Sequence, residues 1–191
     1  MKFDLVLAGV GGQGVLSLAA IISSAAVAEG LHVRQSEVHG MAQRGGAVLA
    51  HLRISDKAIY SDLVPRGAAD MILSMEPLES LRYAVWLSDK GTLVTAAEPF
   101  INISNYPELE GVLKIIKSLP SFRIVETAAL AKEAGLSRAV NMVMVGAASA
   151  FLPLKSETLE ATIEKMFADK EKTVVEANKK AFTLGRKAAN N

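Results

Sequence analysis

Residues 3–20 read FDLVLAGVGGQGVLSLAA, an apolar run that passes through a glycine-rich turn into an alanine-rich run. Phe3 to Ala8 has the length and apolar character of a buried β-strand, and Val15 to Glu29 predicts a helix that Gly30 ends. Leu31 to Ser36 alternates in polarity, which is typical of a second strand. A strand, a glycine turn, a helix and a strand joined by short connections predict a parallel sheet with right-handed crossovers.

The rest of the chain alternates between strand and helix patterns before it becomes wholly helical. We expect strands, from apolar or alternating runs, at Ala47–Ile54, Asp70–Met75, Gly91–Ala96 and Phe122–Glu126, with Lys57–Tyr60 paired to the first of these. We expect helices from Pro77 to about Leu87, over Leu109–Ser118, and from a capping Thr127 to about Gly135. The last third predicts a buried helix over Val140–Phe151, a helix capped by Ser156, and a final helix with Val174, Ala177, Ala181 and Leu184 on one face. We expect Asn141 to cap the first of these helices; the alternative is an interface contact.

This order of elements predicts the fold class. Strands that alternate with helices along one chain indicate an α/β fold, doubly wound, with a mostly parallel Rossmann-like sheet and a helical C-terminal extension. The chain has 191 residues, which suits a single domain. Within that domain we expect residues 1–138 to form the sheet core and residues 139–191 to form the helical extension.

The composition excludes several classes of function. Lys and Arg number 21 against 20 Asp and Glu, and aromatic residues make up 5%, so we expect no nucleic-acid partner. The chain has no cysteine, and therefore no disulfide, no thiol nucleophile and no cysteine ligand for zinc or an iron–sulfur cluster. The histidines lack metal-site spacing and no nucleophile pattern occurs, so we assign neither a metal ligand nor a catalytic residue. Because no stretch has the composition of a signal peptide or a spanning helix, we expect a cytoplasmic protein without a membrane partner.

The glycine turn is the first candidate site. Gly9-Val10-Gly11-Gly12-Gln13-Gly14 matches G-x-G-x-x-G directly after a predicted strand and at the start of a predicted helix. In that context the glycines make a tight turn, let backbone amides approach a phosphate and allow close helix–strand packing, while the helix N-terminus attracts an anion. The candidate cofactor-binding residues are Gly9, Gly11, Gly12, Gln13 and Gly14. The alternative is a glycine turn that binds nothing.

The second candidate site is the segment Glu37–Gly46, which reads EVHGMAQRGG and fits no regular period. Glu37 ends the second predicted strand, about where a dinucleotide-binding fold carries the acid that grips a ribose hydroxyl; the alternative is an exposed strand-end acid. Arg44 precedes two glycines and is placed to hold a phosphate or carboxylate bidentately; the alternative is a charged, exposed loop. The candidate cofactor-binding residues here are Glu37, His39, Gln43, Arg44, Gly45 and Gly46.

Four segments together resemble the gamma-type domain of the 2-oxoacid:ferredoxin oxidoreductases. They are GVGGQGVLSLAAIIS (9–23), SEVHGMAQRGGAVLAHLRIS (36–55), LSMEPLESLR (73–82) and VNMVMVGAAS (140–149). The most specific piece is VHGMAQRGG, Val38 to Gly46, which a plain dinucleotide-binding fold has no reason to share. The likeness runs from about Phe3 to Gly185, and within the family it is closest to the small (beta) subunit of the indolepyruvate:ferredoxin oxidoreductases.

The resemblance implies a division of labour between subunits. Such enzymes decarboxylate a 2-oxo acid with thiamine diphosphate, pass electrons through iron–sulfur clusters to ferredoxin, and transfer the acyl group to coenzyme A. The resemblance implies that a large partner subunit carries the thiamine diphosphate and the clusters, and that this chain alone binds no cofactor tightly. This chain would complete a hetero-oligomer that acts on indolepyruvate or another aryl pyruvate, either helping to bind coenzyme A or bordering the active site.

Two other hypotheses remain open from the sequence. A stand-alone dinucleotide- or nucleotide-binding Rossmann-like protein would explain the glycine motif and Glu37, but it leaves His39 to Gly46 unexplained. A purely structural subunit would have a glycine turn that binds nothing. Binding of a nucleotide or coenzyme A by the isolated chain, and co-purification with a cysteine-rich large subunit, discriminate among the three hypotheses.

Overall fold

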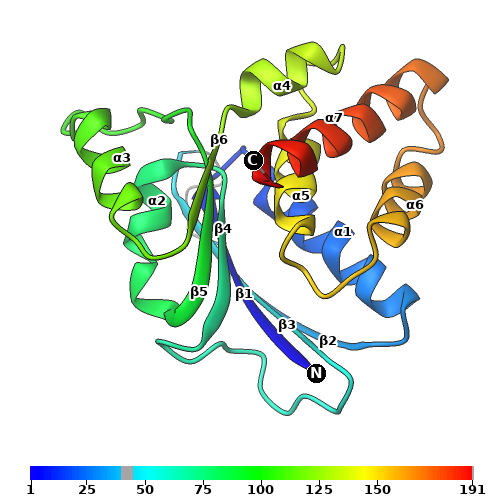
Figure 1. Ribbon diagram of the computed structural model, residues 1–191, viewed down its shortest axis with the longest axis horizontal. Helices are drawn as coiled ribbons and strands as arrows, with labels where there is room; N and C mark the ends of the chain where they lie inside the picture. Colours follow the sequence, from blue (N-terminus) through cyan, green and yellow to red (C-terminus); the bar gives the residue numbers. More distant parts are fainter. Residues whose placement is uncertain (40–44, 191) are drawn as a thin grey trace.

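The computed structural model describes residues 1–39 and 45–190 and has three layers, a central sheet with helices on both faces (Figure 1). One face carries α1 (Val15–Ala28), α5 (Val140–Ser149), α6 (Ser156–Met166) and α7 (Lys172–Asn190). The other face carries α2 (Pro77–Arg82), a 3₁₀ turn (Ala84–Trp86) and α3 (Leu109–Lys117), while α4 (Thr127–Glu133) contacts α5 and α7. Helices on both faces of a mostly parallel sheet confirm the predicted α/β fold class.

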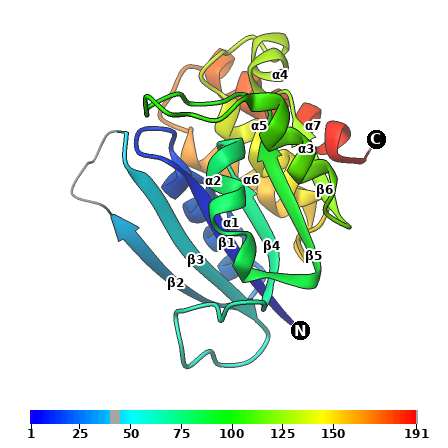
Figure 2. The same cartoon turned by 90° about the vertical axis from the view of Figure 1, so that its left-hand side faces the viewer.

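The sheet has six strands in the order β2-β3-β1-β4-β5-β6. Their bounds are β1 Lys2–Val10, β2 His32–His39, β3 Ala47–Ser55, β4 Ala69–Ser74, β5 Leu87–Ala96 and β6 Phe122–Val125. The pairs β1–β4, β4–β5 and β5–β6 are parallel, whereas β3 is antiparallel to both β1 and β2. The first strand, helix and strand predict a parallel arrangement. That prediction is incomplete, because β3 lies between β1 and β2 and is antiparallel to both (Figure 2).

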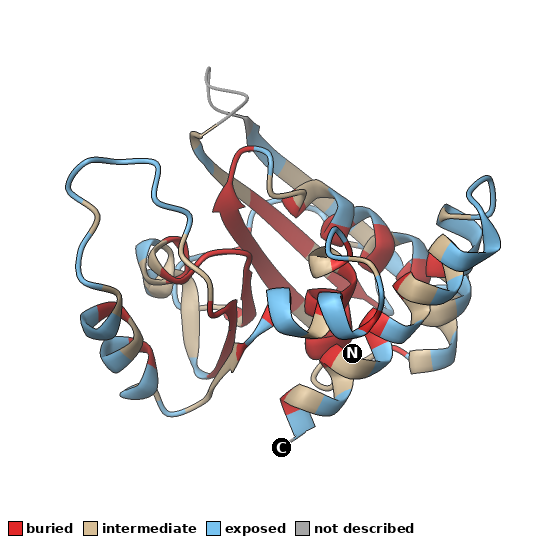
Figure 3. Cartoon of the chain, turned by 90° about the horizontal axis from the view of Figure 1, so that it is seen from above, coloured by how far each residue is buried: buried red, intermediate tan, exposed pale blue. Residues whose placement is uncertain are grey.

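The two faces of β1 enter separate hydrophobic clusters. Leu5 and Leu7 pack toward the cluster that contains α1, α5, α6 and α7, and Val6 packs toward the cluster that contains Ile116 of α3. All three side chains are fully buried. β1 lies inside the sheet between β3 and β4, and Figure 3 shows buried residues along the middle of the sheet. A strand buried on both faces has a nearly continuous apolar sequence, which is why this segment shows no alternation.

Glycines let two of the C-terminal helices approach closely. A Cβ atom at Gly146 of α5 would lie 2.0 Å from the carbonyl oxygen of Phe182, and one at Gly185 of α7 would lie 1.9 Å from that of Val143. Any larger residue at either position would separate the helix backbones. α5 is almost wholly buried beneath α7, in the same cluster as α1. Within the described residues, no helix is long and apolar enough to cross a membrane.

Two of the predicted elements on the α2 side are different in the structure. Lys57–Tyr60 is not a strand; it belongs to a loop that Arg53 fixes by donating to the carbonyl oxygens of Ser61 and Leu63, at 3.2 and 3.1 Å. The helix that begins at Pro77 ends at Arg82 rather than near Leu87. Trp86 then packs edge-on to the rings of Tyr83 and His51, and β5 begins at the next residue.

Three predicted helix caps are wrong, because each side chain bonds elsewhere or lies inside the helix. Thr127 and Ser156 are the first residues of α4 and α6, and the residues before them occupy the cap positions. The Thr127 hydroxyl instead donates to Glu98. Asn141 is the second residue of α5, and its side chain donates to the backbone of Gly14.

Candidate functional site

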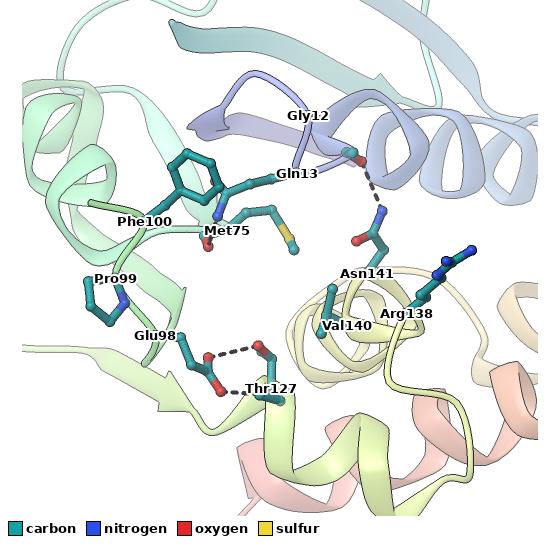
Figure 4. Close-up of a pocket in the computed structure, with 12 residues that line it drawn as sticks. Gly12, Gln13, Met75, Glu98, Pro99, Phe100, Thr127, Arg138, Val140 and Asn141 are labelled. Atoms are coloured by element: carbon teal, nitrogen blue, oxygen red, sulfur yellow. Dashed lines mark hydrogen bonds between the residues drawn. The ribbon is translucent and has the colours of Figure 1, made fainter. Parts of the chain in front are cut away.

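A cavity of about 450 Å³ opens at the carboxyl ends of β1, β4, β5 and β6 (Figure 4). The helices that follow the neighbouring strands β1 and β4 lie on opposite faces of the sheet. Such a switch point is where open α/β sheets bind ligands. The cavity is lined by Gly12, Gln13, Gly14, Met75, Glu98, Pro99, Phe100, Thr127, Ala128, Arg138, Val140 and Asn141.

Three of the five candidate residues of the glycine turn line this cavity: Gly12, Gln13 and Gly14. Gly12 and Gly14 have φ angles of 100° and 78°, in the region that favours glycine. Gly14 is also the residue from which α1 begins, so the N-terminus of α1 faces the cavity. Gly9 allows close packing, since a Cβ atom there would lie 2.7 Å from Cγ2 of Val15.

The polar groups of Gln13 and Gly11 bond within the protein. Oε1 of Gln13 accepts from the backbone of Val10 at 2.7 Å, and Nε2 donates to the carbonyl oxygen of Met75 at 3.1 Å (Figure 4). This side chain therefore joins the ends of β1 and β4. The N–H of Gly11 donates to Gly46 at 2.8 Å, and its carbonyl oxygen accepts from Gly45 at 3.2 Å. The structure thus brings the two candidate segments together by backbone pairing rather than through a ligand.

Glu37 lies away from the cavity. It is an exposed residue inside β2 rather than at its end, and the side chain of Gln35 donates to its carboxylate. Because β3 separates β2 from β1, this carboxylate is one strand farther from the glycine turn than in a dinucleotide-binding sheet. His39 is the last residue of β2 and pairs with Val48. Gln43 and Arg44 lie outside the described residues.

The wall opposite the glycine turn is built from residues that directly follow β5 and β6. Glu98 accepts from the Thr127 hydroxyl at 2.8 Å and from the N–H of Ala128 at 2.6 Å, which joins the ends of the two strands (Figure 4). Sequence reasoning missed Met75, Glu98, Phe100 and Arg138. The signal that could have found Met75, Glu98 and Phe100 is their position shortly after predicted strands, because the residues that follow parallel strands converge at one edge of a sheet.

The charges of the cavity favour an anion on the side of α1. Among the described residues that line it, Arg138 is the one cation and Glu98 the one anion. The Glu98 carboxylate already accepts two hydrogen bonds, whereas the exposed Arg138 guanidinium has no partner within the described part of the chain. An arginine beside a helix N-terminus suits a phosphate or carboxylate. Residues 1–39 and 45–190 contain no group of three or more metal-ligating side chains.

Named proteins with similar sequences are oxidoreductase subunits. The chain is 38% identical to the indolepyruvate oxidoreductase subunit IorB of Pyrococcus horikoshii, over 98% of this chain and 96% of the relative. It is 36% identical to the subunit of the same name from Archaeoglobus fulgidus, over 97% of this chain and 94% of the relative. These matches confirm the resemblance to the small subunits of indolepyruvate oxidoreductases.

Solved structures of similar fold agree with these relatives. The pyruvate oxidoreductase subunit PORC of Thermotoga maritima matches with a TM-score of 0.75 and 25% identity, over 98% of this chain and 96% of that chain. The 2-oxoglutarate:ferredoxin oxidoreductase of Magnetococcus marinus, solved with 2-oxoglutarate, coenzyme A and succinyl-CoA bound, matches with a TM-score of 0.79. That match has 21% identity and covers 99% of this chain but 31% of the longer one, so it shows the fold alone. Since the profile of the pyruvate ferredoxin/flavodoxin oxidoreductase family matches residues 4–188, the chain belongs to that family.

Proposed function

We propose that the chain is the small subunit of a thiamine-diphosphate-dependent oxidoreductase that converts indolepyruvate or another aryl pyruvate to an acyl-CoA, with ferredoxin as electron acceptor. The observation that carries this proposal is the 38% identity to an indolepyruvate oxidoreductase subunit over 98% of this chain and 96% of that subunit. A match over nearly the full length of both chains supports the same role for both.

The catalytic cofactors belong, in this proposal, to a large partner subunit. An iron–sulfur cluster needs thiolate or comparable ligands, and this sequence contains no cysteine. Thiamine diphosphate in the partner would supply the decarboxylation chemistry. The residues of this chain would complete the assembly and hold part of a substrate.

Coenzyme A is the ligand that we assign to the cavity at the strand ends. A phosphate group fits between the N-terminus of α1, at Gly12 and Gly14, and the guanidinium of Arg138. Met75, Phe100 and Val140 provide apolar surface for uncharged parts of the molecule. Since a cavity of about 450 Å³ is at the small end for a ligand of this size, the partner subunit would cover the remainder.

Co-purification tests this assignment. We expect the tagged chain to retain a cysteine-rich subunit that contains iron and thiamine diphosphate, and we expect the complex to require coenzyme A for turnover of indolepyruvate. A chain that purifies alone from its native cells and binds a nicotinamide nucleotide would instead favour a stand-alone dinucleotide-binding protein. Assembly with the large subunit, but turnover independent of every cavity residue, would favour a structural subunit.

A further inference from the structure

The carboxylate of Glu76 joins two parts of the fold. Glu76 precedes α2 and is 1% exposed. Its Oε2 accepts from the N–H of Glu79 at 2.8 Å and so caps α2. Its Oε1 accepts from the N–H of Phe100 at 3.3 Å and from the hydroxyl of Tyr106. One oxygen therefore holds a helix, and the other holds the segment 97–108 that connects β5 to α3.

The segment 97–108 has little apolar packing of its own. Residues 100–105 are all exposed, including Ile101 at 71%. At its start, Ala97 donates to Val125 and the Glu98 carboxylate accepts from Thr127 and Ala128. From Phe100 onward, its described fixed points are the two bonds to Glu76 and a bond from the side-chain amide of Asn102 to the carbonyl oxygen of Gly45. A segment that buries so little apolar surface depends on such bonds for its position.

This segment also forms one wall of the cavity, through Glu98, Pro99 and Phe100. The Glu76 carboxylate accepts hydrogen bonds from Phe100, which belongs to that wall, and from Tyr106, which directly follows the exposed residues 100–105. Both ends of the exposed stretch are thus attached to the same carboxylate oxygen. Movement of this stretch would displace Phe100, which is its one residue that lines the cavity.

We propose that Glu76 and Tyr106 are positioning residues, which clasp the segment 97–108 and so set the wall that coenzyme A contacts. The consequence for coenzyme A rests on the proposed function; the clasp does not. Burial and the hydrogen bond to Glu76 raise the pKa of Tyr106 above its usual range, so the hydroxyl keeps the proton that it donates at physiological pH.

Tyr106→Phe removes the hydroxyl and leaves the ring, and Tyr60→Phe is the matched control because Tyr60 is 97% exposed. In hydrogen–deuterium exchange on the full chain, we expect the amide of Phe100, which donates to the same carboxylate, to exchange about ten- to a hundredfold faster in Tyr106→Phe, as loss of a charged hydrogen bond implies. We expect Tyr60→Phe to match wild type. Unchanged exchange in Tyr106→Phe overturns the proposal.

A second variant separates capping from clasping. Glu76→Asp keeps a good capping carboxylate for α2 but is one methylene shorter, so it should lose contact with Phe100 and Tyr106. We expect it to reproduce the faster exchange of the Phe100 amide while α2 keeps its protection. If α2 loses protection and the exchange of the Phe100 amide does not change, Glu76 serves the helix alone and the clasp is overturned.

Kinetics of the complex with the large subunit test the positioning role. We expect Tyr106→Phe to raise KM for coenzyme A about tenfold with kcat close to wild type, since a general structural defect would lower kcat through loss of folded enzyme. Faster exchange with an unchanged KM for coenzyme A also overturns the proposal, because the position of the segment would then not affect the cavity wall that coenzyme A contacts. A wild-type complex whose turnover does not need coenzyme A overturns the proposed function instead, and exchange alone then decides the clasp.

Discussion

The side-chain amide of Asn141 donates to the carbonyl oxygen of Gly14 at 3.3 Å, across 127 residues of sequence. Gly14 is the residue just before α1 and Asn141 lies in the first turn of α5, so this bond joins the glycine turn to the C-terminal helices at the edge of the cavity. The glycine turn is therefore held by tertiary contacts as well as by its own conformation.

Gly14→Ala tests this contact. A Cβ atom at Gly14 would lie 2.2 Å from Nδ2 of Asn141, and the φ of Gly14 is 78°. Gly30 is the matched control, because its φ is 76° and nothing lies within 4 Å of its added Cβ. Both alanines should cost about 1–2 kcal/mol for the left-handed backbone, and Gly14→Ala about 1–3 kcal/mol more for the displaced amide. Urea unfolding measures the loss of stability in each variant. Equal losses would show that the Asn141 side chain moves aside without a cost in free energy.

Gly185→Ala tests the close approach of α5 and α7. The added methyl group would meet the backbone of Val143, which cannot move aside as a flexible side chain could. We expect a loss of about 1–3 kcal/mol in the free energy of unfolding, as for other overpacked cores. Gly111→Ala, in α3 with nothing within 4 Å, should instead gain about 0.5–1 kcal/mol from helix propensity. If Gly185→Ala were stabilised as Gly111→Ala is, that result would contradict the close packing described for α5 and α7.

The imidazole of His51 makes stability depend on pH. Burial, and then the charge of Arg53, lower the pKa of His51 below its ordinary value of 6.5. Its Nδ1 accepts from the N–H of Val64 at 3.1 Å, a bond that protonation removes. The unfolded chain therefore binds the proton more readily, so this contribution is present above the unfolded pKa and is lost as the pH falls through that value toward the folded pKa.

Unfolding in urea at about pH 8 and about pH 5 measures this effect. We expect wild type to lose more stability on acidification than His51→Gln does. His32→Gln is the control, since His32 is exposed, and it should behave like wild type. If His51→Gln and wild type have the same pH dependence, another group is responsible.

The local parts of the fold could be predicted from the sequence, whereas the long-range parts could not. Leu5 to Leu7 and the glycine turn carry a strand–turn–helix pattern that depends only on neighbouring residues. The position of β3 between β1 and β2 depends on which strand edges pair, and the hydrophobic periodicity of the sequence carries no information about that pairing. The predicted cap at Thr127 failed for the same reason, because its hydroxyl donates to Glu98 in the segment that follows β5.

The candidate site was predicted in part. Gly12, Gln13 and Gly14 do line a cavity, because a glycine turn after a central strand has a recognisable pattern. The opposite wall, at Glu98 and Thr127, and Arg138 before α5 come from three segments that only the folded chain brings together. The assignment of all the candidate residues to cofactor binding stays a prediction, and Gln43 and Arg44 lie outside the described residues.

Arg138 is the residue whose replacement most directly probes the anion that we propose for the cavity. Arg138→Ala removes the guanidinium and Arg138→Lys removes its planar fork, so both should raise KM for coenzyme A in the complex, by about ten- to a hundredfold for the alanine. Lys132→Ala removes a positive charge from α4 without touching the cavity lining, and it should leave KM unchanged. If wild type and all three variants have the same KM for coenzyme A, the Arg138 guanidinium stays in solvent and does not contact the ligand.

Reduction of a viologen dye by the chain, the co-purifying large subunit and the reconstituted pair is the most direct measurement of the subunit assignment. With indolepyruvate and coenzyme A present, we expect the pair to reduce the dye, with both substrates required, and the isolated chain to be inactive. Reduction by the isolated chain, or a pair that assembles yet stays inactive with every aryl pyruvate, would contradict the role of this chain as the small subunit of such an enzyme.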